Sequence, residues 1–172
     1  MRALTAAVLA GVLSTGVTGG ASAGEHPPGC FPMLLVRVID GDSVYGYVDT
    51  SDPAVAIRGT LRILGIDTPE TGGRARCDAE RAKAVEAKSY LASQLEESLS
   101  RPVRGLARAC DIGMDKYGRR LGRLEVYSNH QWVDLGALLI KKGLAFPYDG
   151  GKRGQTWCTC LDSGQCPEGY QG

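Results

Sequence analysis

Three short polar segments interrupt the ends of otherwise apolar runs. The segments are Asp40-Gly41-Asp42-Ser43, Arg62 with Asp67-Thr68-Pro69-Glu70-Thr71, and Asp115-Lys116-Tyr117-Gly118-Arg119. Each segment alone is explained by a hairpin turn, a loop cap or a solvated connection. Together they would bring Asp42 and Asp67 to the ends of neighbouring strands, where clustered carboxylates suit a hard divalent cation. Calcium or magnesium fits these oxygen ligands better than zinc, because no histidine or cysteine converges on them.

Arg62 precedes Asp67 by an odd number of residues in a run that is typical of a long strand. Odd spacing places two side chains on opposite faces of a strand. Gly65 lies between them, where a bulge would rotate the chain and bring the two side chains together. The grouping of Arg62 with the carboxylates therefore depends on an irregularity at Gly65.

Alternating and β-branched runs bounded by Gly, Pro and Asp predict the strands that must position these residues. Five strands are expected, over residues 33–39, 44–48, 55–66, 103–109 and 121–127. The first three follow one another closely and predict an antiparallel meander. Five strands with a helix between the third and the fourth are typical of a small Greek-key barrel of the oligonucleotide- or oligosaccharide-binding type, the OB-fold. The predicted fold class is therefore α+β, mainly β, with a five-stranded Greek-key OB-fold barrel.

One long and one short helix are expected beside the strands. Residues 78–99 lack Gly and Pro and carry an apolar face at helical spacing, formed by Ala84, Ala87, Leu91 and Leu95. A short helix is predicted after Asp134, which can cap its start. Lys141, Lys142 and Gly143 provide its basic last turn and its end.

The composition describes one globular domain rather than a disordered or fibrous chain. The 172 residues include 20 Lys+Arg, 19 Asp+Glu and 24 Gly, and 43% of them are hydrophobic. The high glycine content favours short elements and turns. The near-neutral charge argues against a protein that binds polyanions through a large excess of basic residues.

The N-terminal residues resemble a secretory signal peptide. Arg2 is followed by the apolar run 3–13, and Ala21, Ser22 and Ala23 provide small residues for cleavage after about Ala23. A secreted or periplasmic protein is expected, without a membrane anchor in its mature form, because the apolar run is too short to span a bilayer.

Six cysteines lie beyond the expected cleavage site, and an even number in an exported chain predicts disulfides. A zinc site is the weaker alternative, since no histidine is close to Cys158, Cys160 or Cys166. We expect Cys77 to pair with Cys110. The long helix carries the chain roughly 30 Å away from Cys77, and a fourth strand of about 26 Å would return it.

Four motifs, in this order along the chain, resemble the staphylococcal (thermo)nuclease family over roughly residues 33–148. They are Val38-Ile39-Asp40-Gly41-Asp42-Ser43, Leu61-Arg62-Ile63-Leu64-Gly65-Ile66-Asp67-Thr68-Pro69-Glu70-Thr71, Asp115-Lys116-Tyr117-Gly118-Arg119 and Lys142-Gly143-Leu144-Ala145. The resemblance implies the same barrel and a nuclease that hydrolyses DNA and RNA with little sequence preference. A monomer is expected.

The resemblance also implies a role for each matching residue. Asp42, Asp67 and the main-chain carbonyl of Thr68 would bind Ca²⁺, and Arg62 and Arg119 would bind the scissile phosphate. Glu70 would be the general base. Lys116 and Tyr117 would contact the terminal phosphate of the nucleotide. This chemistry is reasonable in itself, because guanidinium groups and a metal ion offset the charge of a phosphodiester transition state.

The expected organisation is a signal peptide over residues 1–23, a lead-in over 24–32, the nuclease-like domain over 33–148 and an irregular Gly- and Cys-rich tail over 149–172. The sequence departs from the family at the C-terminus, where a basic helical segment is missing and Tyr148 is one place out of register with a nucleotide-stacking tyrosine. The alternative function is a secreted, non-catalytic OB-fold module that binds nucleic acid, glycan or protein.

Overall fold

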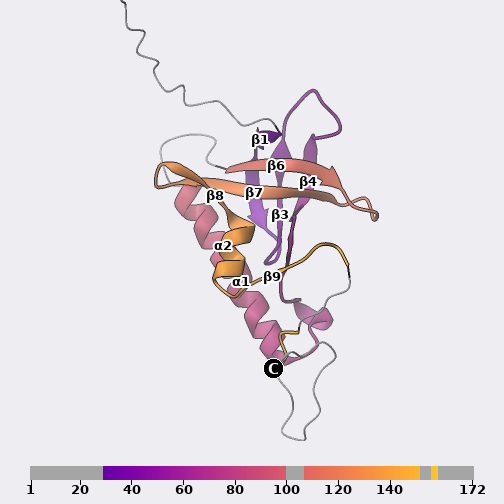
Figure 1. Cartoon of the computed structure of the whole chain (residues 1–172), viewed down its shortest axis with the longest axis vertical. Helices are drawn as coiled ribbons and strands as arrows, with labels where there is room; N and C mark the ends of the chain where they lie inside the picture. Colours follow the sequence, from indigo (N-terminus) through magenta and orange to yellow (C-terminus); the bar gives the residue numbers. More distant parts are fainter. Residues whose placement is uncertain (1–28, 100–106, 152–155, 159–172) are drawn as a thin grey trace, which may run out of the picture.

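The computed structural model describes residues 29–99, 107–151 and 156–158 (Figure 1). The predicted signal peptide over 1–23 lies outside the described residues, as do Cys160 and Cys166. Among the helices of the described part, none has the length and apolar character needed to cross a membrane.

Seven strands of the described chain form one sheet. The strands are β1 (Cys30–Pro32), β2 (Leu34–Val38), β3 (Ser43–Val48), β4 (Ile57–Ile63), β6 (Ala107–Met114), β7 (Arg120–Ser128) and β8 (Gln131–Asp134). Their order is β1-β6-β7-β4-β3-β2, with β8 paired to β7 outside this path. Only β4 and β7 run parallel among these pairs of described strands. Two short strands, β5 (Ile66–Asp67) and β9 (Phe146–Pro147), pair separately.

The predicted class of mainly β structure with two helices is confirmed, but the described sheet does not close into a five-stranded barrel. Its path ends at β1 and β2, which do not pair with each other. Met33 separates these two segments, and its side chain is buried while its N–H donates to the carbonyl of Ala107 over 2.9 Å. The strand predicted over residues 33–39 corresponds to β2, which pairs with β3. Strand β1 lies within the segment predicted as a lead-in and pairs with β6.

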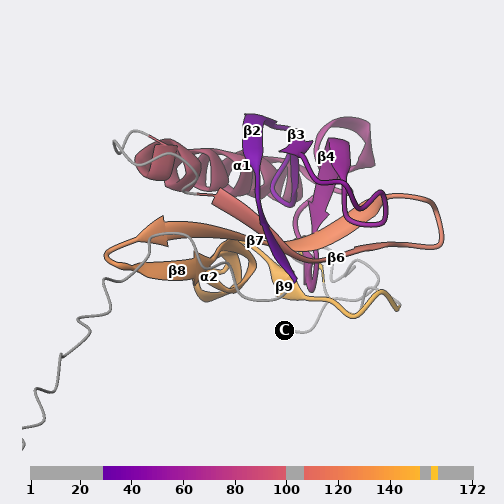
Figure 2. The same ribbon diagram turned by 90° about the horizontal axis from the view of Figure 1, so that it is seen from above.

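The two helices pack beside the sheet (Figures 1 and 2). The long helix α1 (Asp78–Leu99) buries the predicted apolar face, formed by Ala84, Ala87, Leu91 and Leu95. The short helix α2 (Leu135–Lys141) begins after Asp134, whose carboxylate accepts a hydrogen bond from the N–H of Ala137 over 2.9 Å. A single 3₁₀ turn, η1 (Gly72–Arg74), precedes α1.

The acidic turn between β2 and β3 lies directly against α1. A Cβ atom at Gly41 would be 2.9 Å from the Cβ atom of Ala87 and 3.0 Å from the side chain of Thr68. Only glycine allows this approach without displacing either neighbour. The helix, the turn that carries Asp42 and the loop that carries Thr68 are therefore held together at one point.

Two disulfides join distant parts of the chain, Cys30 to Cys110 and Cys77 to Cys158. The prediction that Cys77 pairs with Cys110 is wrong. It assumed that the fourth strand returns the chain to the start of the long helix, whereas β6 is an interior strand of the sheet, between β1 and β7. In that position Cys110 is in register with Cys30 of β1.

Candidate active site

Arg62 lies between two carboxylates at the end of β4. Its Nη1 is 2.8 Å from Oδ1 of Asp42, and its Nη2 is 3.4 Å from Oδ1 of Asp67. The expected irregularity occurs at Gly65, which adopts a φ of 83° in the turn between β4 and β5. This turn ends one strand and begins the next, so that Arg62 and Asp67 meet despite their odd spacing.

Both carboxylates of this centre are buried. Asp42 is 3% exposed and Asp67 is 7% exposed. Burial raises the pKa of Asp42 to about 6, and the charge of Arg62 only partly offsets that effect. The Ser43 hydroxyl donates to Oδ1 of Asp42 over 3.0 Å, and the Asp42 N–H donates to Oδ1 of Asp40 over 3.2 Å. Burial thus makes the ionised form of Asp42 costly, and additional positive charge nearby would relieve that cost.

The predicted ligands fit calcium by their chemistry. Asp42, Asp67 and the carbonyl of Thr68 are all oxygen donors, and two acidic side chains here face one guanidinium. A calcium ion takes six to eight oxygens, so water and further carbonyl groups would complete such a site. Elsewhere in the described residues, three metal-ligating side chains converge at Cys30, Cys110 and Glu125 and at Cys77, Glu80 and Cys158. Both groups contain a disulfide, whose sulfurs are not thiolates.

A pocket of about 360 Å³ opens beside this centre, and we call it the acidic pocket. Its lining includes Asp40, Asp42, Ser43, Arg62, Thr68, Glu70, Arg74, Arg119 and Tyr148. The structure thus brings the predicted general base Glu70 and both predicted phosphate-binding arginines to one cavity. Oε2 of Glu70 lies 3.1 Å from Nε of the largely exposed Arg74.

Arg119 is oriented by the hairpin between β6 and β7. Its Nε lies 2.6 Å from Oδ2 of Asp115, and its N–H donates to Oδ1 of the same carboxylate over 2.9 Å. Desolvation raises the pKa of Asp115, but the hydrogen bonds from Arg119 and Tyr117 and the charge of Arg119 together hold that pKa below its ordinary value. Asp115 therefore stays ionised and keeps Arg119 in place.

Lys116 and Tyr117 lie at the exposed tip of the same hairpin. Nζ of Lys116 is 5.2 Å from the centre of the Tyr117 ring. Neither residue lines the acidic pocket, although both are close to Arg119 in the chain. They are placed beside the site rather than within it.

Glu80 is a structural residue of this site that the sequence analysis did not identify. It is 1% exposed at the start of α1. Its Oε1 accepts a hydrogen bond from the N–H of Glu70 over 3.3 Å, and its Oε2 accepts one from the N–H of Arg76 over 2.8 Å. The disulfide between Cys77 and Cys158 is adjacent to the same carboxylate. The helical spacing between Glu80 and Ala84 places Glu80 on the apolar face of α1. A carboxylate on that face is the sequence signal that could have identified it.

Tyr148 also reaches the acidic pocket, although it is out of register with the family pattern. Its N–H donates to the carbonyl of Gly65 over 3.0 Å, and its hydroxyl donates to the carbonyl of Gly151 over 2.8 Å. These bonds hold the chain after β9 against the turn at Gly65.

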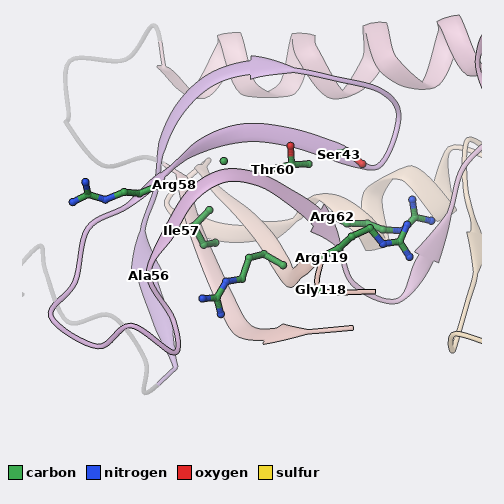
Figure 3. Close-up of a pocket in the computed structure, with 10 residues that line it drawn as sticks. Ser43, Ala56, Ile57, Arg58, Thr60, Arg62, Gly118 and Arg119 are labelled. Carbon is green, nitrogen blue, oxygen red and sulfur yellow. The ribbon is translucent and has the colours of Figure 1, made fainter. Parts of the chain in front are cut away.

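A second pocket, of about 460 Å³, lies next to the acidic pocket along β4, and we call it the arginine pocket (Figure 3). Arg58, Arg62, Arg119 and Arg120 contribute to its lining. The side chains of Arg62 and Arg119 meet at one end, and Arg58 extends from the other end (Figure 3).

Comparison with protein families gave a match over residues 60–157 to the family described as staphylococcal nuclease homologue. The matched segment covers more than half of the chain and includes Arg62, Asp67, Glu70 and Arg119. Asp42 lies before it. No curated protein sequence matched the chain.

Proposed function

Since the chain belongs to the staphylococcal nuclease homologues, we propose that it is a calcium-dependent nuclease that hydrolyses phosphodiester bonds of DNA and RNA. The observation that carries this proposal is the convergence of the buried Asp42, Glu70 and the predicted phosphate-binding arginines on the acidic pocket, with the buried Asp67 paired to one of these arginines, Arg62. Each has a role in water attack on a phosphodiester.

In the proposed reaction, a water molecule attacks phosphorus while the carboxylate of Glu70 accepts its proton. The bond between phosphorus and the leaving oxygen breaks, and that oxygen is protonated by solvent. Arg62 and Arg119 hydrogen-bond the phosphoryl oxygens, whose negative charge increases in the transition state. A general base in this position contributes typically about 10² to 10⁴ in rate.

Asp42, Asp67 and the carbonyl of Thr68 would bind calcium. When bound, the ion adds positive charge near the phosphate and neutralises the two carboxylates that Arg62 now serves as counter-ion. The raised pKa of Asp42 supports this assignment, because a desolvated carboxylate gains most from a cation.

The substrate class follows from the groups in the pocket. Arginine, glutamate and a metal ion act on the phosphodiester, which DNA and RNA share, so we expect little sequence preference. Lys116 and Tyr117, at the tip of the hairpin, would contact a terminal phosphate. The expected signal peptide and the two disulfides support a secreted or periplasmic protein, and we propose that it acts as a monomer.

A non-catalytic binding module is the alternative, and it would leave Arg62 permanently paired with its two carboxylates. Plasmid DNA and RNA digestion with calcium or with a chelator separates the two functions. Calcium-dependent hydrolysis that is lost in the folded double variant Asp42→Ala with Arg119→Ala supports the nuclease. Hydrolysis at the wild-type rate by that variant would disprove the proposed site.

A further inference from the structure

The outer face of β4 leads away from the acidic pocket as a row of polar side chains. Ile57, Leu61 and Ile63 are at most 1% exposed and belong to the core. Arg58 and Thr60 occupy the alternate positions and are exposed, in the same row as Arg62. Because side chains alternate along a strand, this row continues the site on the outer surface of the sheet.

Strand β3 adds two tyrosines to the same face. Tyr45 is in register with Thr60, and Tyr47 is in register with Arg58. Residues directly opposite in an antiparallel pair share a face. The two rings lie 6.0 Å apart in an edge-to-face arrangement, and Tyr47 is 39% exposed. The face therefore offers aromatic surface beside cationic side chains.

The arginine pocket joins this face to the reaction site. It shares Ser43, Thr60, Arg62 and Arg119 with the acidic pocket, so the two cavities adjoin each other. Its lining holds four arginines and no aspartate or glutamate. Such a lining is complementary to a polyanion, even though the whole chain is close to neutral.

Two of the four arginines, Arg58 and Arg120, carry a positive charge that their contacts neutralise only weakly or not at all. Arg120 donates to the carbonyl oxygens of Ala54 and Pro53 over 2.5 and 2.9 Å, and these neutral acceptors leave its charge in place. Arg58 lies 3.9 Å from Asp49, with side chains 82% and 95% exposed. So exposed a pair contributes little and can be exchanged for a phosphate.

We infer that this surface, formed by Tyr45, Tyr47, Arg58, Thr60 and Arg120, binds the single-stranded nucleic acid that flanks the phosphodiester held in the acidic pocket. The inference rests on the proposed nuclease function and adds a substrate track to it. Arginines would contact successive phosphates, and the exposed Tyr47 ring would stack on an unpaired base. A duplex keeps its bases stacked internally, so it gains nothing from that ring.

The test compares substrates that differ in length. The double variant Tyr47→Ala with Arg58→Ala removes the exposed ring and the exposed charge, and Lys88→Ala removes an exposed charge on α1 that lines neither pocket. We expect the double variant to raise KM for a single-stranded 12-mer by about fivefold or more and to leave the hydrolysis of a dinucleotide unchanged. Arg58→Ala alone should give part of this effect, and Lys88→Ala none. An unchanged KM for the 12-mer, or an equal rise for both substrates, would overturn the inference.

Binding keeps this test independent of turnover. In calcium, the Glu70→Gln protein should bind a fluorescent single-stranded 12-mer more tightly than the same protein that also carries Tyr47→Ala and Arg58→Ala. A preference for a duplex 12-mer, or equal affinity of the two proteins for the single strand, would refute the track. If the wild-type protein binds the single strand through this surface but cleaves nothing, the nuclease proposal fails and the track stands.

Discussion

Removing the buried carboxylate of Glu80 should loosen the loop that carries Glu70. Glu80→Ala leaves the N–H groups of Glu70 and Arg76 without their acceptor, and Arg76 also loses the partner that lies 3.5 Å from its Nε. An unsatisfied buried donor costs about 1–3 kcal/mol, and water can reach the exposed Arg76 more easily than Glu70. We therefore expect a loss of about 2–4 kcal/mol in the free energy of unfolding. For a chain of this size, that lowers Tm by roughly 5–15 °C.

Glu80→Gln is the informative intermediate. The amide keeps one acceptor oxygen, but its NH₂ group must face the second N–H donor. The free energy of unfolding of Glu80→Gln should lie between that of the wild type and that of Glu80→Ala. In the proposed reaction Glu70 must reach the attacking water, and a displacement of about 1 Å can cost 10² in rate. We expect kcat to fall by about tenfold or more in Glu80→Ala at a temperature where the variant is folded, with KM little changed.

The assay pairs thermal unfolding with steady-state hydrolysis of an oligonucleotide at a temperature well below the Tm of every variant. Glu86→Ala is the matched control, since Glu86 lies on the same helix, is exposed and forms a surface ion pair with Lys83 over 2.9 Å. It should change stability by less than about 1 kcal/mol and leave kcat unchanged. The reasoning is refuted if Glu80→Ala keeps the wild-type Tm and kcat, or if Glu80→Gln is the more damaging substitution.

Other predictions concern the proposed base, the buried aspartate and the charge contacts. Glu70→Gln should lower kcat by about 10² or more at an unchanged calcium requirement, and wild-type turnover in this variant would exclude Glu70 as the base. The pKa of Asp42, about 6 in the fold against 3.8 ordinarily, means that the metal-free folded protein binds a proton at Asp42 more tightly than the unfolded chain does. Its contribution to stability is present below about pH 4 and is lost, by about 3 kcal/mol, as the pH rises through 6. Urea unfolding in chelator should show this decline in the wild type but not in Asp42→Asn. In a plot of the logarithm of the binding constant against the logarithm of the salt concentration, short single strands should give a slope of about −2, for three phosphate contacts. Long single strands should give a slope of about −3.5 if Arg58 and Arg120 also contact phosphates. Equal slopes for the two lengths would contradict the added contacts.

Local patterns were sufficient for much of the fold. The alternation around Val44 predicted β3, and the apolar spacing from Ala84 to Leu95 predicted α1 with its buried face. The cap at Asp134 and the end at Gly143, where φ is 65°, follow from side-chain and backbone preferences that need no distant partner. Each of these features depends only on neighbours along the chain.

Features that depend on distant partners were missed or misplaced. The strand predicted over 103–109 continues to Met114, because a register shift after Cys110 accommodates Asp111 and its positive φ within β6. Residues 100–106, where the prediction began, lie outside the described residues. The pairing of Cys110 depends on which strand lies beside β6 and in which register, and a sequence pattern does not encode either.

The candidate site was predictable in its residue types but not in its support. Asp42, Arg62 and Asp67 meet as the turn at Gly65 suggested. Glu80 was missed because its two acceptor contacts join segments that only the folded chain brings together. Motifs identify the groups proposed to act on a substrate, whereas the groups that hold them are recognisable only from burial.

The two disulfides interleave along the chain, since Cys77 falls between Cys30 and Cys110, and Cys110 falls between Cys77 and Cys158. A single backbone cut anywhere between Cys30 and Cys158 therefore leaves the two resulting fragments covalently joined. Proteases outside a cell commonly nick exposed loops, and a fragment that stays attached can keep its place in the fold. Release of a fragment from this region requires either two cuts between the same pair of neighbouring disulfide cysteines or chemical reduction. This pattern of crosslinks therefore favours long persistence of the folded chain in a proteolytic environment.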